Sequence, residues 1–198
     1  MTKANLLFPT PVWTIQLPNY KNVNEQMYNF IKLQQKNDGI GVNKSNVKGW
    51  HSKEFNLNTK EIQTFITFIL PGIEQVMTDM NWEKQKQTAK INNMWSIINT
   101  GGSANLRHQH GNSTISGAYY VRAPINSGEI VFYDPRPAPV YSHPNVVNPN
   151  LLNAQVNSIT PKEGALVLFP SYLDHSVNEN LSNDERIVVS FNIKIQMK

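Results

Sequence analysis

Cysteine is absent from this 198-residue chain, which sets the first limit on its chemistry. Without thiols there can be no disulfide, no zinc finger, no thiolate nucleophile and no cysteine-ligated iron–sulfur cluster. A metal ion would have to be held by histidine, aspartate or glutamate side chains. Long apolar runs are missing as well: no stretch approaches about eighteen consecutive apolar residues, and the first residues lack the apolar core of a signal peptide. We therefore expect a cytoplasmic protein without a membrane-spanning segment.

Charge gives little indication of a partner. Charged residues make up 16 % of the chain, and the net charge of +4 comes from scattered lysines. No basic run with interleaved aromatic residues is present, so the sequence pI near 9.2 does not indicate a nucleic-acid partner. The length fits one domain with a substantial hydrophobic core, and we treat residues 1–198 as a single unit.

The first 82 residues predict an opening strand over residues 6–17, interrupted by Pro9 and Pro11, followed by two helices. The helices are expected to be capped by Asn22 and Asn58, because each asparagine is followed by a glutamate at the third position, as in a capping box. Between the helices, residues 38–56 have the glycines and asparagines of a loop.

After Trp82 the apolar period changes from helical to alternating, which is typical of strands. Turns such as NTGG, NSG, PKEG and LSND separate seven predicted strands, at 91–99, 115–123, 129–134, 152–160, 165–169, 175–179 and 185–197. Many short strands without intervening helices favour a sandwich or barrel over βαβ units. The sequence therefore predicts a mainly β (α+β) fold, in which two helices within residues 1–82 buttress one face of a jelly roll formed by residues 90–198.

Three histidines have the spacing of a metal site. His108 and His110 lie two residues apart ahead of a predicted strand, and such residues point to the same side of an extended segment. His175 follows the apolar run GALVLF, which places it near the same end of a barrel. Three protein ligands with open positions are typical of a catalytic ion, and imidazole suits iron, copper, nickel and zinc alike. Asp134 is a reserve candidate for a carboxylate ligand, although a salt bridge with Arg136 is the favoured interpretation.

The last predicted strand has two different faces. One face is apolar, whereas the other holds Arg186, Ser190 and Asn192. An arginine, a serine and an asparagine on one strand face would be costly to bury without partners. We therefore expect this face to line a wet cavity.

The other histidines and the loop tryptophan receive structural interpretations. His51 and His143 are not expected to be direct metal ligands, because a lone histidine is more often a surface or hydrogen-bonded residue. Trp50 is interpreted as a loop anchor in preference to a substrate wall. Residues 38–56 and 134–153 are predicted to surround the mouth of the cavity.

Five motifs taken together resemble a known family. They are HQH, SGAYYV, FYDPR, GALVLFPSYLDH and RIVVSFN, and the similarity spans nearly the whole chain, including the FPTPVW opening and the GWHS segment. The combination is similar to the iron(II)- and 2-oxoglutarate-dependent oxygenases of the prolyl hydroxylase-like branch found in marine bacteria and their phages. The resemblance implies a double-stranded β-helix, which is the cupin-like form of the jelly roll. For a phage protein, the cytoplasmic location would be that of the host.

The resemblance also implies a ligand set. Iron(II) would be held by His108, His110 and His175. His110 stands where the wider superfamily has an aspartate or glutamate, so a neutral ligand there leaves the site one negative charge poorer.

For the cosubstrate, the resemblance implies that Arg186 pairs with the distal carboxylate of 2-oxoglutarate, since a guanidinium fork suits a carboxylate. Ser190 and Tyr120 correspond to positions that hydrogen-bond the same carboxylate. With dioxygen, such an enzyme would hydroxylate a C–H bond of its substrate and release succinate and carbon dioxide.

Two other functions remain open from the sequence. One is a three-histidine metal cupin, a dioxygenase or isomerase that needs no 2-oxoglutarate. The other is a noncatalytic jelly-roll module that binds a ligand in its cavity. The substrate could be a peptide or a small metabolite, and edge strands of jelly rolls often pair, so we expect a homodimer.

Overall fold

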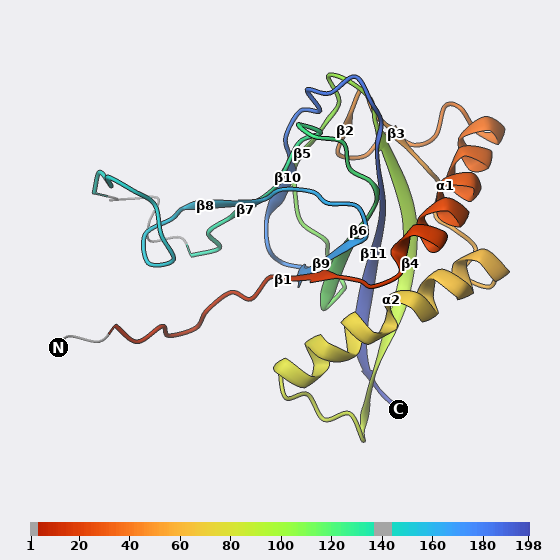
Figure 1. The fold of residues 1–198 in the computed structure, drawn as a ribbon. Helices are drawn as coiled ribbons and strands as arrows, with labels where there is room; N and C mark the ends of the chain where they lie inside the picture. The colour runs from red at the N-terminus through yellow and green to blue at the C-terminus, as the bar shows by residue number, and fades with distance from the viewer. Residues whose placement is uncertain (1–3, 137–143) are drawn as a thin grey trace.

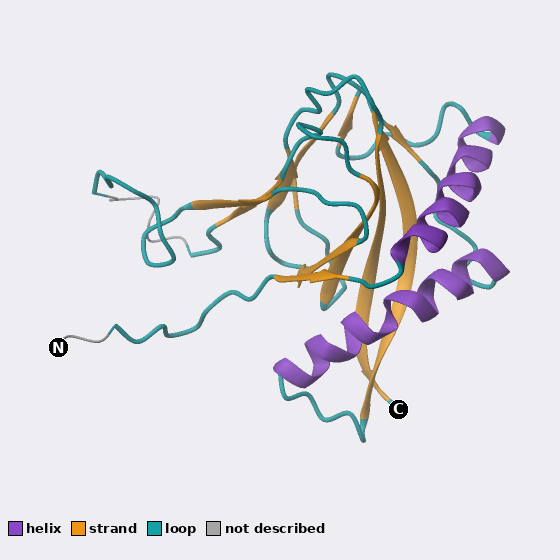
Figure 2. Ribbon diagram, viewed as in Figure 1, coloured by secondary structure: helices purple, strands orange, loops and turns teal. Residues whose placement is uncertain are grey.

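Two antiparallel β-sheets face each other, and two helices cover one of them (Figures 1 and 2). The computed structural model describes residues 4–136 and 144–198. The six-stranded sheet has the order β1-β9-β6-β11-β4-β3, from strands β1 (Trp13–Gln16), β9 (Ala165–Pro170), β6 (Ile115–Arg122), β11 (Arg186–Met197), β4 (Gln87–Asn99) and β3 (Trp50–His51). The five-stranded sheet has the order β2-β5-β10-β7-β8, from β2 (Asn46–Val47), β5 (Ala104–His108), β10 (His175–Val177), β7 (Ile130–Tyr133) and β8 (Val156–Ile159). This is the jelly roll that the alternating sequence pattern predicted.

Both helices pack on the outer face of the six-stranded sheet (Figure 2). The helix α1 (Tyr20–Asn37) contacts β6, and α2 (Lys60–Asp79) contacts β9 and β4. Met27 and Phe65 are fully buried between them and the sheet, and the Phe65 ring meets Tyr119 edge-on with centroids 5.1 Å apart. This core supports the sheet from behind. Within the described residues, neither of these helices nor any other is long and apolar enough to cross a membrane.

The helix starts differ from the predicted ones. α1 begins two residues before the expected cap at Asn22, and its N-cap is Asn19, in a left-handed conformation without a side-chain capping bond. Tertiary pairing decides this start, because the Leu17 amide donates to Gly164 O at 3.1 Å and so fixes the chain just ahead of the helix. α2 is capped by Thr59, one residue after the predicted Asn58.

Three short strands were missed by the pattern. β2 and β3 lie inside residues 38–56, which the glycines and asparagines had marked as a loop, and β5 carries too few apolar residues to alternate clearly. The opening strand is also shorter than predicted and begins only after Pro11. These strands form through pairing with distant segments, a signal that local periodicity does not contain.

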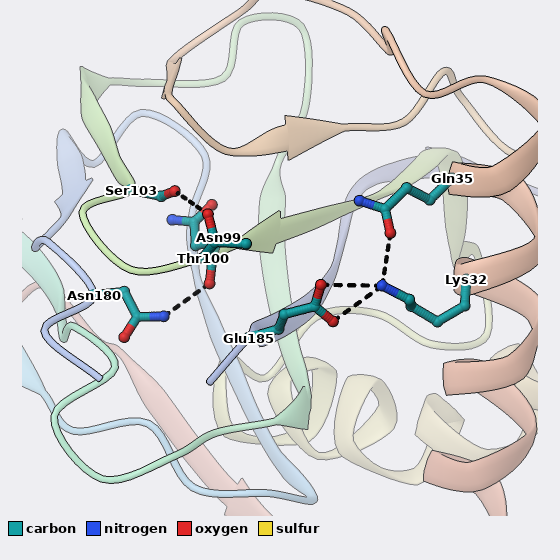
Figure 3. A network of polar contacts seen from close by, with 7 residues as sticks. All are labelled: Lys32, Gln35, Asn99, Thr100, Ser103, Asn180 and Glu185. Carbon is teal, nitrogen blue, oxygen red and sulfur yellow. Dashed lines mark hydrogen bonds and ion pairs between the residues drawn. The ribbon is translucent and has the colours of Figure 1, made fainter. Parts of the chain in front are cut away.

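Polar contacts fix the entry into β11, as Figure 3 shows. The Asn180 amide is fully buried, and its Nδ2 donates to Asn99 O and Asp184 O, both at 2.8 Å. This ties the loop after β10 to the end of β4. Next to it, Lys32 of α1 forms an ion pair with Glu185 at 3.0 Å. The residue that follows, the first of β11, is therefore held in position from two sides.

Replacing Asn180 with alanine should destabilise the fold, because the buried carbonyl of Asn99 and the partly buried carbonyl of Asp184 would lose their donor. We expect the free energy of unfolding to fall by about 2–4 kcal/mol, the loss of two hydrogen bonds with one buried acceptor left unpaired. Urea denaturation measures it. As a control, Asn58→Ala removes an exposed amide and should change stability by less than about 0.5 kcal/mol. Equal midpoints for the two variants would contradict this account of Asn180.

Candidate metal centre and cosubstrate pocket

Strand pairing brings the three predicted histidines together. His108 ends β5, His175 begins β10, and the two residues lie opposite each other in the antiparallel ladder. The chain beyond β5 is held by the His110 amide, which donates to Ser171 O at 2.9 Å. One potential ligand atom of each histidine lies within 4.8 Å of the others. The three side chains therefore converge on one point, as the sequence predicted.

Backbone carbonyls orient two of the three rings. His108 Nδ1 lies 2.7 Å from Leu106 O, and His175 Nδ1 lies 2.9 Å from Leu173 O. Because a carbonyl only accepts, each Nδ1 carries the proton and each Nε2 keeps its lone pair for a metal. His110 has no side-chain hydrogen-bond partner within the described residues. Its ring is free to serve as the third ligand.

Burial keeps these imidazoles neutral. Desolvation lowers the pKa of His110 to about 3 and that of His175 to about 4, and the neighbouring histidines add to the effect. The pKa of His108 is lowered by the same cause. The Phe169 ring, with its centroid 4.7 Å from that of His175, adds an apolar surface beside the cluster. Neutral imidazoles with free lone pairs suit iron(II), so the donor set fits the metal that the motifs implied.

A cavity of about 720 Å³ extends from the histidines between the two sheets. On β11 it is lined by one face of the strand, namely Arg186, Val188, Ser190 and Asn192. The opposite face of the same strand is buried in the hydrophobic core under the helices. The predicted division of the last strand into a core face and a cavity face is confirmed.

Arg186 forms part of the cavity wall and is only 2 % exposed. Its Nη1 donates to Ser127 O at 2.9 Å and to Gly128 O at 2.7 Å, while Nε is buried without a partner. Within residues 4–136 and 144–198 it forms no ion pair with a carboxylate. A buried cation held only by carbonyls lacks its counter-ion. The pocket therefore fits an anionic group, such as the distal carboxylate of 2-oxoglutarate.

Two hydroxyl groups face the same cavity. Tyr120 is 2 % exposed, and burial raises its pKa to about 12, an effect that Arg186 opposes, so the hydroxyl is protonated at neutral pH. Ser190 lines the cavity from the strand that Arg186 begins. Neither hydroxyl has a hydrogen-bond partner within the described part of the chain. Both can donate to a bound carboxylate.

Other predicted residues lie apart from this site. Asp134 does not belong to the histidine cluster, so the structure does not support it as a reserve metal ligand. It forms the favoured salt bridge with Arg136, with 2.7 Å between Oδ2 and Nη2. Trp50 is buried and donates from Nε1 to Asp38 O at 2.7 Å, so it is an anchor. His143 lies outside the described residues.

Sequence reasoning placed residues 38–56 at the mouth of the cavity, but it singled out neither His51 among them nor Trp95 and Asn93 of β4 as cavity residues. All three line the cavity without belonging to the histidine cluster. Trp95 and Asn93 stand at alternate positions of β4, which an alternation count could have placed on the cavity face once the core face was known. His51 gave no such signal, because β3 is only two residues long.

The fold is similar to solved structures of oxygenases. They include a prolyl-4-hydroxylase from Pseudomonas putida (TM-score 0.64, 9 % identity, covering 93 % of this chain and 92 % of that one). The collagen prolyl hydroxylase of Paramecium Bursaria Chlorella virus-1 in its 2OG complex has a TM-score of 0.60 and 14 % identity, with 92 % and 94 % covered. HygX from Streptomyces hygroscopicus, with nickel, 2-oxoglutarate and hygromycin B bound, has a TM-score of 0.64 and 11 % identity, with 93 % and 83 % covered. The shared architecture is the double-stranded β-helix.

A family model described as "Putative 2OG-Fe(II) oxygenase" matches residues 93–192. The matched segment begins in β4, ends in β11 and includes the histidine cluster and Arg186. Among curated proteins, none matches the chain in sequence. The motifs, the fold and the family model agree on an enzyme that uses iron(II), 2-oxoglutarate and dioxygen. The chain belongs to the 2OG-Fe(II) oxygenase family.

Proposed function

We propose that this protein hydroxylates a C–H bond of its substrate, with the metal on one side of the cavity and Arg186 anchoring the cosubstrate. The observation that carries the proposal is that three neutral imidazoles and an unpaired buried guanidinium line one cavity. When bound, iron(II) with 2-oxoglutarate and dioxygen supplies the oxidising chemistry, which converts R–H to R–OH and releases succinate and carbon dioxide.

In this proposal His108, His110 and His175 hold the metal. The carbonyl contacts at Nδ1 fix the direction of two ligands before any metal arrives, which reduces the ordering cost of binding. All three ligands are neutral, so none of them offsets the charge of a divalent ion. An anionic cosubstrate would then be attracted both by the metal and by the arginine.

Arg186, Tyr120 and Ser190 would bind the distal carboxylate. The carbonyl contacts of Nη1 keep the guanidinium from moving toward solvent, and the two hydroxyls add neutral donors from neighbouring strands. Ile130 and Val188 also line this part of the protein's cavity and limit water around the charge pair. A charge-assisted pair of this kind gains strength when it is shielded from solvent.

The competing functions explain less of the site. A three-histidine cupin that needs no 2-oxo acid assigns no role to a buried arginine without a counter-ion. A noncatalytic binding module assigns no role to three imidazoles whose ligand atoms converge. The substrate in our proposal is a peptide or a small metabolite that enters over the histidines.

Arg186→Ala should weaken 2-oxoglutarate binding far more than metal binding. Removing one partner of a buried charge pair costs about 2 kcal/mol or more, so the Kd for 2-oxoglutarate should rise at least about 30-fold. Anaerobic titration of the apo protein with iron(II) and then 2-oxoglutarate measures both steps, the second through the visible charge-transfer band of the chelate. Arg186→Lys keeps the positive charge but loses the forked guanidinium. Its Kd for 2-oxoglutarate should lie between those of the unchanged protein and Arg186→Ala. Equal losses of iron and 2-oxoglutarate would reject this role of Arg186.

His110→Ala should weaken iron(II) binding because it removes one of three ligands. We expect a loss greater than about 100-fold, above the range typical of groups that only orient a ligand. Asp134→Asn is the matched control and should leave iron affinity unchanged, since Asp134 lies outside the histidine cluster. Isothermal titration calorimetry with iron(II) under nitrogen measures the iron affinity of both variants. If Asp134→Asn has the larger effect, the carboxylate completes the metal site and His110 does not.

A further inference from the structure

A fourth histidine lines the cavity outside the ligand cluster. His51 is only 8 % exposed and lies on β3, at the edge of the six-stranded sheet. Its backbone is fixed on both sides: Val42 N donates to His51 O at 2.9 Å, and Ser52 N donates to Ser96 O at 2.9 Å. The side chain is therefore held in a rigid position facing the cavity.

The hydrogen bond of His51 determines its tautomer. Nδ1 lies 2.7 Å from Ser52 O, and because a carbonyl accepts only, Nδ1 carries the proton. Nε2 is then a hydrogen-bond acceptor. This Nε2 has no hydrogen-bond partner within the described residues. It is also not one of the fully buried polar side-chain atoms, so a ligand in the cavity can reach it. The protein thus presents one unpaired acceptor to the cavity from a side chain that is more than nine-tenths buried.

Trp95 connects His51 with the metal cluster. The His51 ring stacks on the Trp95 indole, with ring centroids 5.7 Å apart and planes 9° apart. The Trp95 indole also contacts the His110 ring, with centroids 5.7 Å apart. His51 nevertheless does not belong to the group whose ligand atoms converge. It lies close to the reacting centre without being a ligand.

Asn192 is another buried polar residue of the cavity wall, on β11 two positions beyond the residue that pairs with Trp95. It is 6 % exposed and lines the cavity. Ser116 Oγ donates to its Oδ1 at 2.7 Å, and its Nδ2 donates to Asn93 Oδ1 at 3.1 Å. Asn93 in turn donates to Glu54 Oε1 at 3.0 Å. This chain of bonds fixes the Asn192 amide and leaves it one further N–H and one further lone pair.

Charge restricts what this surface can bind. Arg186 is a buried cation in the same cavity. A divalent metal at the histidines would add two positive charges, and the two carboxylates of 2-oxoglutarate would offset only two of the resulting three, so an ammonium group would still be repelled there. An uncharged donor avoids this cost.

We propose that His51 and Asn192 form the substrate subsite next to the metal, and that the substrate carries an uncharged N–H or O–H donor, hydrogen-bonded to His51 Nε2, close to the C–H bond that is oxidised. The inference rests on the proposed function, because it takes the histidine cluster as the reaction centre. His51 is a positioning residue for the substrate in this arrangement.

Two small amides test the proposal: N-methylacetamide, which has an N–H, and N,N-dimethylacetamide, which has none. With Mn(II) and 2-oxoglutarate bound to the protein, the metal relaxes the methyl proton resonances of a weak, rapidly exchanging ligand near it. We expect N-methylacetamide to be preferred about two- to tenfold, the net effect of one hydrogen bond. His51→Phe keeps a flat ring on Trp95 but removes the acceptor, so it should abolish the preference. His51→Gln restores an acceptor oxygen and should regain part of it.

Lys44→Met is the control, because this exposed side chain also lines the cavity and has no part in the proposed metal and 2-oxoglutarate sites. It should keep the preference of the unchanged protein. The proposed subsite would be rejected if the unchanged protein relaxed the methyl protons of both amides equally. It would also be rejected if the preference for N-methylacetamide persisted in His51→Phe. Loss of iron(II) binding in His51→Phe would also overturn it and make His51 a ligand. Failure of the unchanged protein to form the iron and 2-oxoglutarate chelate band would instead reject the proposed function itself, and this inference with it.

Discussion

The pairing of β5 with β10 is the interaction on which the candidate site depends. This short ladder places His108 opposite His175, and the Ser171 carbonyl holds the following turn so that His110 joins them. Strands β2 and β8 of the five-stranded sheet that carries the ladder are partly exposed, and backbone carbonyls orient two of the three ligand rings. The six-stranded sheet provides the rigid side of the cavity, because two helices bury its outer face (Figure 1).

Arg186 imposes the second constraint. Burying a cation is costly unless polar groups surround it, and here two backbone carbonyls and a fixed strand entry provide that surrounding. Asn180 and the pair of Lys32 with Glu185 hold the chain just before Arg186 (Figure 3). The structure thus holds in place a charge that has no carboxylate partner among the described residues, and an anionic cosubstrate is the natural counter-ion for it. Stability and function are linked at this point of the fold.

Local sequence signals succeeded where a residue's role follows from its own strand. The alternation of the last strand separated Arg186 and Ser190 from the core face, and the spacing of His108 and His110 predicted convergent side chains. They failed where the helix start depended on a distant partner. Asn22 had the pattern of a cap, yet pairing of the preceding segment with the start of β9 moved the cap three residues earlier, to Asn19.

The sequence by itself determined the mainly β fold, the three histidines and the charged strand face, because periodicity, residue type and motif spacing are properties of neighbouring residues. Only the tertiary structure decided that Arg186 has no carboxylate partner within residues 4–136 and 144–198, and that His51 faces the cavity. Each of these depends on which distant groups surround a side chain. Two-residue strands such as β3 form only because a neighbouring strand offers hydrogen bonds, so no local pattern could have placed His51 beside the metal cluster.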